Sequence, residues 1–129
     1  MKKLLLIFLF SMIPFSDLYA EWTLVHKRDG GLEFYVDLER IKKIDGFVYY
    51  WTLQNMSLGN TPYRSGIIYN QGDCKLIRKK VLQMTMYEKR GAMGSPIKVP
   101  KDLFATANKF NYILPNSGSE LMLNKVCNH

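Results

Sequence analysis

The sequence predicts an α+β domain in which an antiparallel β-sheet packs against a C-terminal α-helix. Three observations support this fold class. After residue 20, apolar and polar residues alternate over short runs, which is typical of half-buried strands. Turn-forming pairs such as Asp45-Gly46 separate these runs. Ser117 and Glu120 have the spacing of a capping box, which predicts that a last helix begins there.

The first twenty residues have the pattern of a secretory signal peptide. Two lysines follow Met1, residues 4–13 are almost continuously apolar, and Ala20 is a small residue suited to cleavage. The apolar run is shorter than the roughly 20 residues of a membrane-spanning helix. No cysteine stands at the cleavage point to accept a lipid. We therefore expect a signal peptide at residues 1–20 and a periplasmic or secreted protein without a lipid anchor. An uncleaved N-terminal anchor is the alternative.

Composition indicates one ordered domain in residues 21–129. Hydrophobic residues make up 47% of the sequence and charged residues 22%, which is typical of a globular chain with a core. With 18 basic and 11 acidic residues, the net charge is +7. A basic exported protein favours anionic partners such as lipopolysaccharide, sulfated glycans or acidic protein surfaces. The alternative is that the charge serves only solubility.

The first elements are two strands and a helical turn. Strands are expected at residues 22–28 and 32–38, and Asp29-Gly30-Gly31 predicts a hairpin between them. Residues 37–44 are expected to form one or two helical turns, whose solvent-exposed face carries Arg40, Lys42 and Lys43.

The middle of the chain predicts the centre of the sheet. Residues 47–55 form the clearest strand, and their aromatic and β-branched side chains favour a central position. Another strand is expected at residues 63–70, followed by a turn at residues 71–73. The run 74–89 is long for one strand, and its alternation slips near residues 78–80, which predicts a bulge or a bend.

The last third of the chain is expected to be less regular. Glycines and prolines make residues 91–100 irregular, residues 102–109 suit a short helix, and residues 115–118 read as a loop. The final helix should lay one face on the sheet, made of Leu121, Met122, Lys125 and Val126.

Cys74 and Cys127 are the only cysteines. In an oxidising compartment such a pair predicts one disulfide, which would join the start of a strand to the final helix. The alternative is a metal site made of Cys74, Cys127, His129 and His26. These residues lack the close ligand spacings of zinc sites.

No catalytic or cofactor motif is present in the sequence. It contains no G-x-S-x-G motif and no dinucleotide fingerprint, and the glycine-rich residues 91–95 lack the lysine of a phosphate-binding loop. Three aspartates stand in or beside turns, where they satisfy local backbone N–H groups. We therefore expect a protein that is not an enzyme and has no cofactor. An active site without a known motif is the alternative.

The candidate binding residues are basic and aromatic. The densest basic cluster is made of Lys75, Arg78, Lys79 and Lys80. Tyr35 and Tyr50 belong to the less apolar strand faces, where exposed rings beside lysine and arginine would suit a protein or an anionic glycan. We expect no specific nucleic-acid partner, because the protein is exported. The alternative for the cluster is a charged strand edge that blocks aggregation.

The order of several residues resembles the bacterial surface-adhesin protein E family. In the first half, the similar positions are Trp22, Tyr35-Val36-Asp37, Ile41-Lys42-Lys43, Asp45-Gly46, Trp51 and Asn55. In the second half they are Ser65, Tyr69, Asp73-Cys74-Lys75, Tyr87, Met93-Gly94, Pro115, Gly118-Ser119 and Cys127.

The resemblance implies an antiparallel sheet, a C-terminal helix and a disulfide between them. It also implies binding to host extracellular-matrix proteins and formation of a homodimer. The sequence departs from the family at Phe110, where a tryptophan is common, and in lacking the lipid-acceptor cysteine. The functional hypothesis is an exported, non-enzymatic domain that contacts host-matrix or envelope macromolecules. The alternative is a soluble periplasmic accessory protein without a host ligand.

Overall fold

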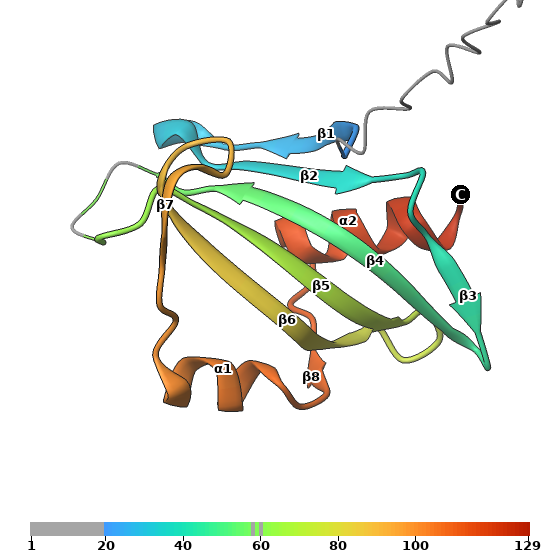
Figure 1. The fold of residues 1–129 in the computed structure, drawn as a ribbon. Coiled ribbons are helices and arrows are strands. Elements are labelled where there is room, and N and C mark those ends of the chain that lie inside the picture. Colours follow the sequence, from blue (N-terminus) through green and yellow to red (C-terminus); the bar gives the residue numbers. More distant parts are fainter. Residues whose placement is uncertain (1–19, 58, 60) are drawn as a thin grey trace, which may run out of the picture.

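The computed structural model describes residues 20–57, 59 and 61–129, so the predicted signal peptide lies, except for Ala20, outside the described residues. Within them, eight strands form one antiparallel sheet in the order β1-β2-β4-β5-β6-β7, with β3 paired to β4 and β8 to β6 (Figure 1). The predicted fold class is confirmed. The bounds are β1 Trp22–Lys27, a 3-10 turn at Asp29–Gly31, β2 Glu33–Asp37, β3 Lys42–Ile44, β4 Phe47–Asn55, β5 Ser65–Asp73, β6 Arg78–Lys89, β7 Met93–Ile97, α1 Lys101–Ala107, β8 Asn111–Tyr112 and α2 Gly118–Cys127.

The core lies between α2 and one face of the sheet. Alternate residues of β2 and β4 point toward the helix, and three apolar side chains of the helix pack against them. Figure 1 shows α2 lying along the sheet near β2 and β4, with α1 at the β6 side. The buried cluster is made of Phe34, Val36, Val48, Tyr50, Met122, Leu123 and Val126.

The strand predicted at residues 47–55 is confirmed and lies at the centre of the sheet. It pairs with β5 from Phe47 opposite Asp73 to Asn55 opposite Ser65 without a break in register. The prediction for the next strand was two residues early at its start and three short at its end, because β5 runs from Ser65 to Asp73.

The helical turns predicted for residues 37–44 are wrong. The Asp37 carboxylate accepts the N–H of Glu39 at 3.0 Å, which makes a turn, and β3 follows at Lys42–Ile44. The Asp45-Gly46 pair has positive φ at both residues and joins β3 to β4 as a tight hairpin. A two-residue hairpin requires strands on both sides, and a helix would exclude this pairing.

The turn predicted at residues 71–73 lies instead just after β5. The Asp73 carboxylate accepts the N–H groups of Lys75 and Leu76 at 3.0 and 3.1 Å, so the chain reverses there and β6 begins at Arg78. The irregularity in β6 lies slightly later than predicted. Leu82 has no partner on β5, because Tyr69 and Asn70 pair with Gln83 and Val81.

The β6 edge of the sheet is paired at both ends and contacted by α1 between them. β7 pairs with one end of β6, although residues 91–100 were expected to be irregular, and β8 pairs with the other end. Between them α1 contacts β6, and the Asn108 side chain donates to the carbonyl of Val81 at 2.7 Å. The alternative that the basic cluster forms a charged strand edge is therefore contradicted at Arg78 and Lys79, which pair with β8.

The capping pattern at the final helix is confirmed. The Ser117 hydroxyl accepts the N–H of Glu120 at 3.2 Å at the start of α2. The predicted sheet-facing residues are half right. Met122 and Val126 are buried, but Leu123 takes the place expected for Leu121, and Lys125 is exposed.

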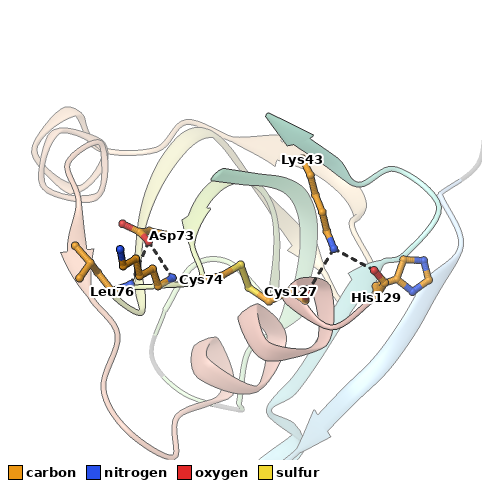
Figure 2. Close-up of a disulfide and its surroundings, with 7 residues drawn as sticks. Lys43, Asp73, Cys74, Leu76, Cys127 and His129 are labelled. Carbon is orange, nitrogen blue, oxygen red and sulfur yellow. Dashed lines mark hydrogen bonds between the residues drawn. A yellow bond between two sulfur atoms is a disulfide. The ribbon is translucent and has the colours of Figure 1, made fainter. Parts of the chain in front are cut away.

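Cys74 and Cys127 form the predicted disulfide, with Cα atoms 6.0 Å apart. Figure 2 shows how it joins the end of α2 to the turn after β5. On the other side of the helix end, Lys43 Nζ donates to the carbonyls of Cys127 and His129 at 3.4 and 3.1 Å. The positive charge of a lysine at the carbonyl end of a helix also interacts favourably with the helix dipole.

Candidate binding surface on the open face of the sheet

The face of the sheet opposite α2 carries a group of aromatic side chains. Cross-strand pairing places Tyr35 opposite Leu53 and Trp51 opposite Tyr69, and alternation along β4 places Tyr49 on the same face as Trp51. The four rings are half-buried, and Leu53 is buried beneath them. We call the face defined by Tyr35, Tyr49, Trp51, Leu53 and Tyr69 the open face.

Three of these rings form one continuous aromatic platform. Trp51 and Tyr69 stack with ring centroids 4.7 Å apart and an angle of 24° between their planes. Tyr49 joins from the neighbouring position, with its centroid 6.4 Å from that of Tyr69. Rigid aromatic rings lose little conformational entropy when they contact a ligand, so such a platform suits binding.

Arg40 places a positive charge over this platform. Its guanidinium carbon lies 5.5 Å from the centroid of Trp51, within range of a cation–π interaction. Asp37 holds it there, because its carboxylate accepts from Arg40 Nε at 2.5 Å and is itself only 1% exposed. The Arg40 side chain remains 49% exposed, so it can contact a ligand.

Two of the predicted basic residues extend the open face. On β6, Arg78 lies opposite Asp73 of β5 and Lys80 lies opposite Gln71. Gln71 is in turn opposite Tyr49, so both basic side chains point to the same face of the sheet as Tyr49. Their cations lie 4.5 and 5.8 Å from the ring centroid of Phe110. The Arg78 side chain also donates to the Asp73 carboxylate at 2.9 Å.

The other predicted site residues lie elsewhere. Lys75 is exposed in the turn after β5, and Lys79 alternates to the face of α2. The prediction for Tyr50 is wrong: it is 1% exposed and belongs to the core, so it cannot contact a macromolecule. Burial raises the pKa of its phenol far above the usual range, because a buried phenolate would be poorly solvated.

A hydrogen-bonded group of polar side chains lies at the other end of the open face. The Glu33 carboxylate accepts from Asn55 Nδ2 and from the Tyr35 hydroxyl, each at 3.2 Å, and pairs with Arg90. The hydrogen bond from Asn55 is the main cause that holds the pKa of Glu33 below its usual value, with help from Tyr35 and Arg90. The Arg90 side chain also donates to the carbonyls of Gly31 and Met56, which ties three loops together.

The alternative metal site is wrong, because the disulfide removes two of its four ligands, Cys74 and Cys127. His26 instead accepts a hydrogen bond from Arg28 and stacks on Phe34 with centroids 6.0 Å apart.

Known proteins resemble this chain over almost all of residues 21–129. The family model of surface-adhesin protein E matches residues 22–128. The chain belongs to the surface-adhesin protein E family. This confirms the resemblance that the sequence indicated. No curated protein sequence matches the chain.

Solved structures of Haemophilus influenzae protein E have the same fold as this member of the surface-adhesin protein E family. One structure is 17% identical and covers 87% of each chain with a TM-score of 0.58. A second crystal form is also 17% identical, and covers 81% of this chain and 91% of its own with a TM-score of 0.55. A selenomethionine form, again 17% identical, covers 85% and 95% with a TM-score of 0.54.

Phe110, where the resemblance led us to expect a tryptophan, has a defined packing role. Its ring stacks on Phe47 with centroids 5.6 Å apart, beneath Arg78 and Lys80.

Within residues 20–57, 59 and 61–129, no helix is long and apolar enough to cross a membrane.

Sequence reasoning did not select Trp51, Tyr69 or Arg40 as site residues. The alternation of β4 already grouped Tyr49 with Trp51, and this signal was available. The missing information was the identity of the face that the helix covers.

Proposed function

We propose that this protein is an exported, non-enzymatic binding domain that contacts an anionic macromolecule through the open face. The observation that carries the proposal is the stacked pair Trp51 and Tyr69 with the Arg40 guanidinium above it. Aromatic rings and arginine are the residues that contribute most to binding energy in protein interfaces. The surface-adhesin family to which the chain belongs supports a binding function.

The distribution of charge supports an anionic partner. Arg78 and Lys80 add two cations at one end of the open face, and the sequence has a net charge of +7. Lys75, in the exposed turn beside them, extends the basic region. Sulfate or carboxylate groups of a matrix or envelope glycan would pair with these cations while its sugar rings stack on the platform.

The acidic groups of the open face have structural roles, which supports a non-enzymatic function. Each of the carboxylates Glu33, Asp37 and Asp73 pairs with an arginine. Glu33 and Asp73 also have lowered pKa values, the latter mainly through the backbone N–H of Leu76. A general base at neutral pH requires a raised pKa instead.

The experiment compares binding to surfaces coated with heparin or basement-membrane matrix. We expect binding that weakens with added NaCl, because the contact is largely between charges. Trp51→Ala and Arg40→Gln should each weaken it at least about tenfold, as truncation of central interface residues does. Leu114→Ala is the matched control, because Leu114 is 75% exposed but lies in the loop between β8 and α2, outside the sheet. Equal binding of all three variants would refute the proposal.

A second candidate is a soluble periplasmic accessory protein of the cell envelope. The observation in its favour is that both cysteines are joined to each other, so neither thiol is available to carry an acyl chain. Fractionation of the native cells separates the two functions. Protein in the medium or on the outer surface supports a matrix ligand, whereas protein confined to the periplasm, with binding only to outer-membrane vesicles, supports the accessory role.

A further inference from the structure

A small cavity lies on the other side of the molecule from the open face, where β6, β8 and the first turn of α2 meet. Its volume is about 230 Å³. A water molecule occupies about 30 Å³ in the liquid, so this cavity has room for a small molecule. Most of its wall is apolar. The lining residues are Lys79, Asn111, Tyr112, Ile113, Leu114, Ser117 and Ser119.

Among the residues that the structure describes, Lys79 is the only charged one in this lining. It pairs across the sheet with Gly72, opposite Val48, which places it on the side of α2. Within the part of the chain that the structure describes, its ammonium takes part in no hydrogen bond or ion pair. Burial also lowers the pKa of this ammonium, because the cation loses part of its hydration. Lys79 is therefore a cation without a counter-charge in an apolar wall.

The neighbouring cations of β6 are engaged elsewhere. Arg78 pairs with Asp73 at 2.9 Å, and Lys80 lies over the ring of Phe110 on the open face. Lys79 alone is available to the cavity. The first turn of α2 contributes Ser117 and Ser119, so the positive end of the helix dipole adds to the same field.

The apolar part of the wall is unusually exposed. Tyr112 and Leu114 are 74% and 75% exposed, and Ile113 between them is half-buried. The segment is held in place, because the N–H of Ile113 donates to the carbonyl of Ile77 at 3.0 Å. Exposed apolar side chains beside an unpaired cation complement a molecule that has an anionic head and a short apolar chain.

We propose that this cavity binds small amphiphilic carboxylates, with the carboxylate paired to Lys79 and the chain covered by Tyr112, Ile113 and Leu114. Hexanoate is a short-chain ligand of this class. This site is separate from the open face, so either proposal can fail without the other.

The test is a titration of the ¹⁵N-labelled protein with sodium hexanoate, followed by amide chemical shifts at constant ionic strength. We expect shifts confined to the backbone around Lys79, Ile113, Leu114 and Ser119. Hexanamide has the same size without the charge, and acetate has the charge without the chain. Both should bind more weakly than hexanoate.

Two lysine variants on the same strand provide the matched comparison. Lys79→Met should weaken hexanoate at least about tenfold, because it removes a charge-assisted hydrogen bond, and should leave hexanamide unchanged. Lys80→Met removes the same charge from the opposite face and should leave hexanoate binding intact. Lys79→Arg should retain it.

Three results would overturn the proposal. They are hexanoate shifts outside the cavity, equal binding of hexanoate and hexanamide, or equal loss in Lys79→Met and Lys80→Met. If Lys79→Met does not fold, the proposal is still tested by the unmodified protein, in which hexanoate must shift only the amides around the cavity and must bind more tightly than hexanamide.

Discussion

Trp51 and Tyr69 lie opposite each other on β4 and β5 and stack at 4.7 Å on the sheet face that does not pack against α2. Had these rings served only the core, they would be expected beneath the helix, as Tyr50 is. Their position instead leaves part of each ring exposed beside Arg40. This geometry is the basis of the proposed binding function.

Loss of the disulfide should strongly destabilise the protein. The bridge closes a loop with a sequence separation of 53. In the chain-entropy model, a loop of this size contributes about 4 kcal/mol to the free energy of unfolding. Cys74→Ser and Cys127→Ser should lower the melting temperature equally, as measured by circular dichroism. A double variant much less stable than either single one would contradict the pairing.

The stability of the turn after β5 should depend on acid pH through Asp73. The N–H of Leu76, the Arg78 side chain and the N–H of Lys75 together lower the pKa of Asp73 below its usual value of 3.8. A carboxyl with a lowered folded-state pKa contributes stability above its unfolded-state pKa. That contribution is lost as the pH falls through the folded-state pKa.

Denaturant unfolding of Asp73→Asn between neutral and acid pH measures this contribution. The variant should be less stable than the unmodified protein at pH 7, and the difference should shrink as the pH falls below 3.8. Asp45→Asn is the control, because Asp45 is exposed in the β3–β4 hairpin. A difference that stays constant over this range would show that Asp73 acts through its shape alone.

The entry of α2 into the core depends on Gly118. A Cβ atom at this position would lie 2.5 Å from the Phe34 ring, which is itself buried. Gly118→Ala should therefore lower the free energy of unfolding by about 1–3 kcal/mol, the usual cost of overpacking. Ser119→Ala, one residue further along the same turn, should change stability much less. If the two variants are equally stable, the helix does not approach Phe34 as closely as described.

Lys79 should reduce the stability of the free protein. Replacing its half-buried, unpaired ammonium with an apolar side chain removes a desolvation cost. Lys79→Met should therefore raise the free energy of unfolding by about 1 kcal/mol. The lowered pKa means that the unfolded chain holds this proton more tightly, so the difference should shrink as the pH rises through the folded-state pKa toward 10.5. A destabilised Lys79→Met would indicate a partner for this ammonium.

The strands and the final helix could be predicted because their signals are local. The alternation of residues 47–55 and the Ser117 cap each depend on neighbouring residues, and both are confirmed. The helical turns expected after Asp37 failed for a local reason as well. The Asp37 carboxylate accepts a hydrogen bond from the N–H of Glu39, which favours a turn. The basic residues after it, Arg40, Lys42 and Lys43, are compatible with either a helix or an exposed strand.

The choice between the two faces of β4 could not be made from that strand. One face carries Tyr49 and Trp51 and the other Val48 and Tyr50, so both are apolar. The neighbouring strand decides, because Gly72 lies beside Val48 and a Cβ atom there would be 2.5 Å from Leu123. Leu123 of the helix packs against the glycine position of β5, and predicting this requires knowledge of the pairing register.

The basic cluster shows the same limit. Arg78, Lys79 and Lys80 are adjacent in sequence, but they lie in a strand and alternate between its faces. The first and third contribute to the open face and the second to the cavity beside α2.

The central claim is tested most directly by the accessibility of Trp51 in the presence of a ligand. In a Trp22→Phe protein, Trp51 is the single tryptophan, and its fluorescence reports quenching by acrylamide. If the open face is the binding surface, heparin should protect Trp51 and lower the quenching constant, and added NaCl should restore it. Unchanged quenching of Trp51 at saturating heparin would contradict the account.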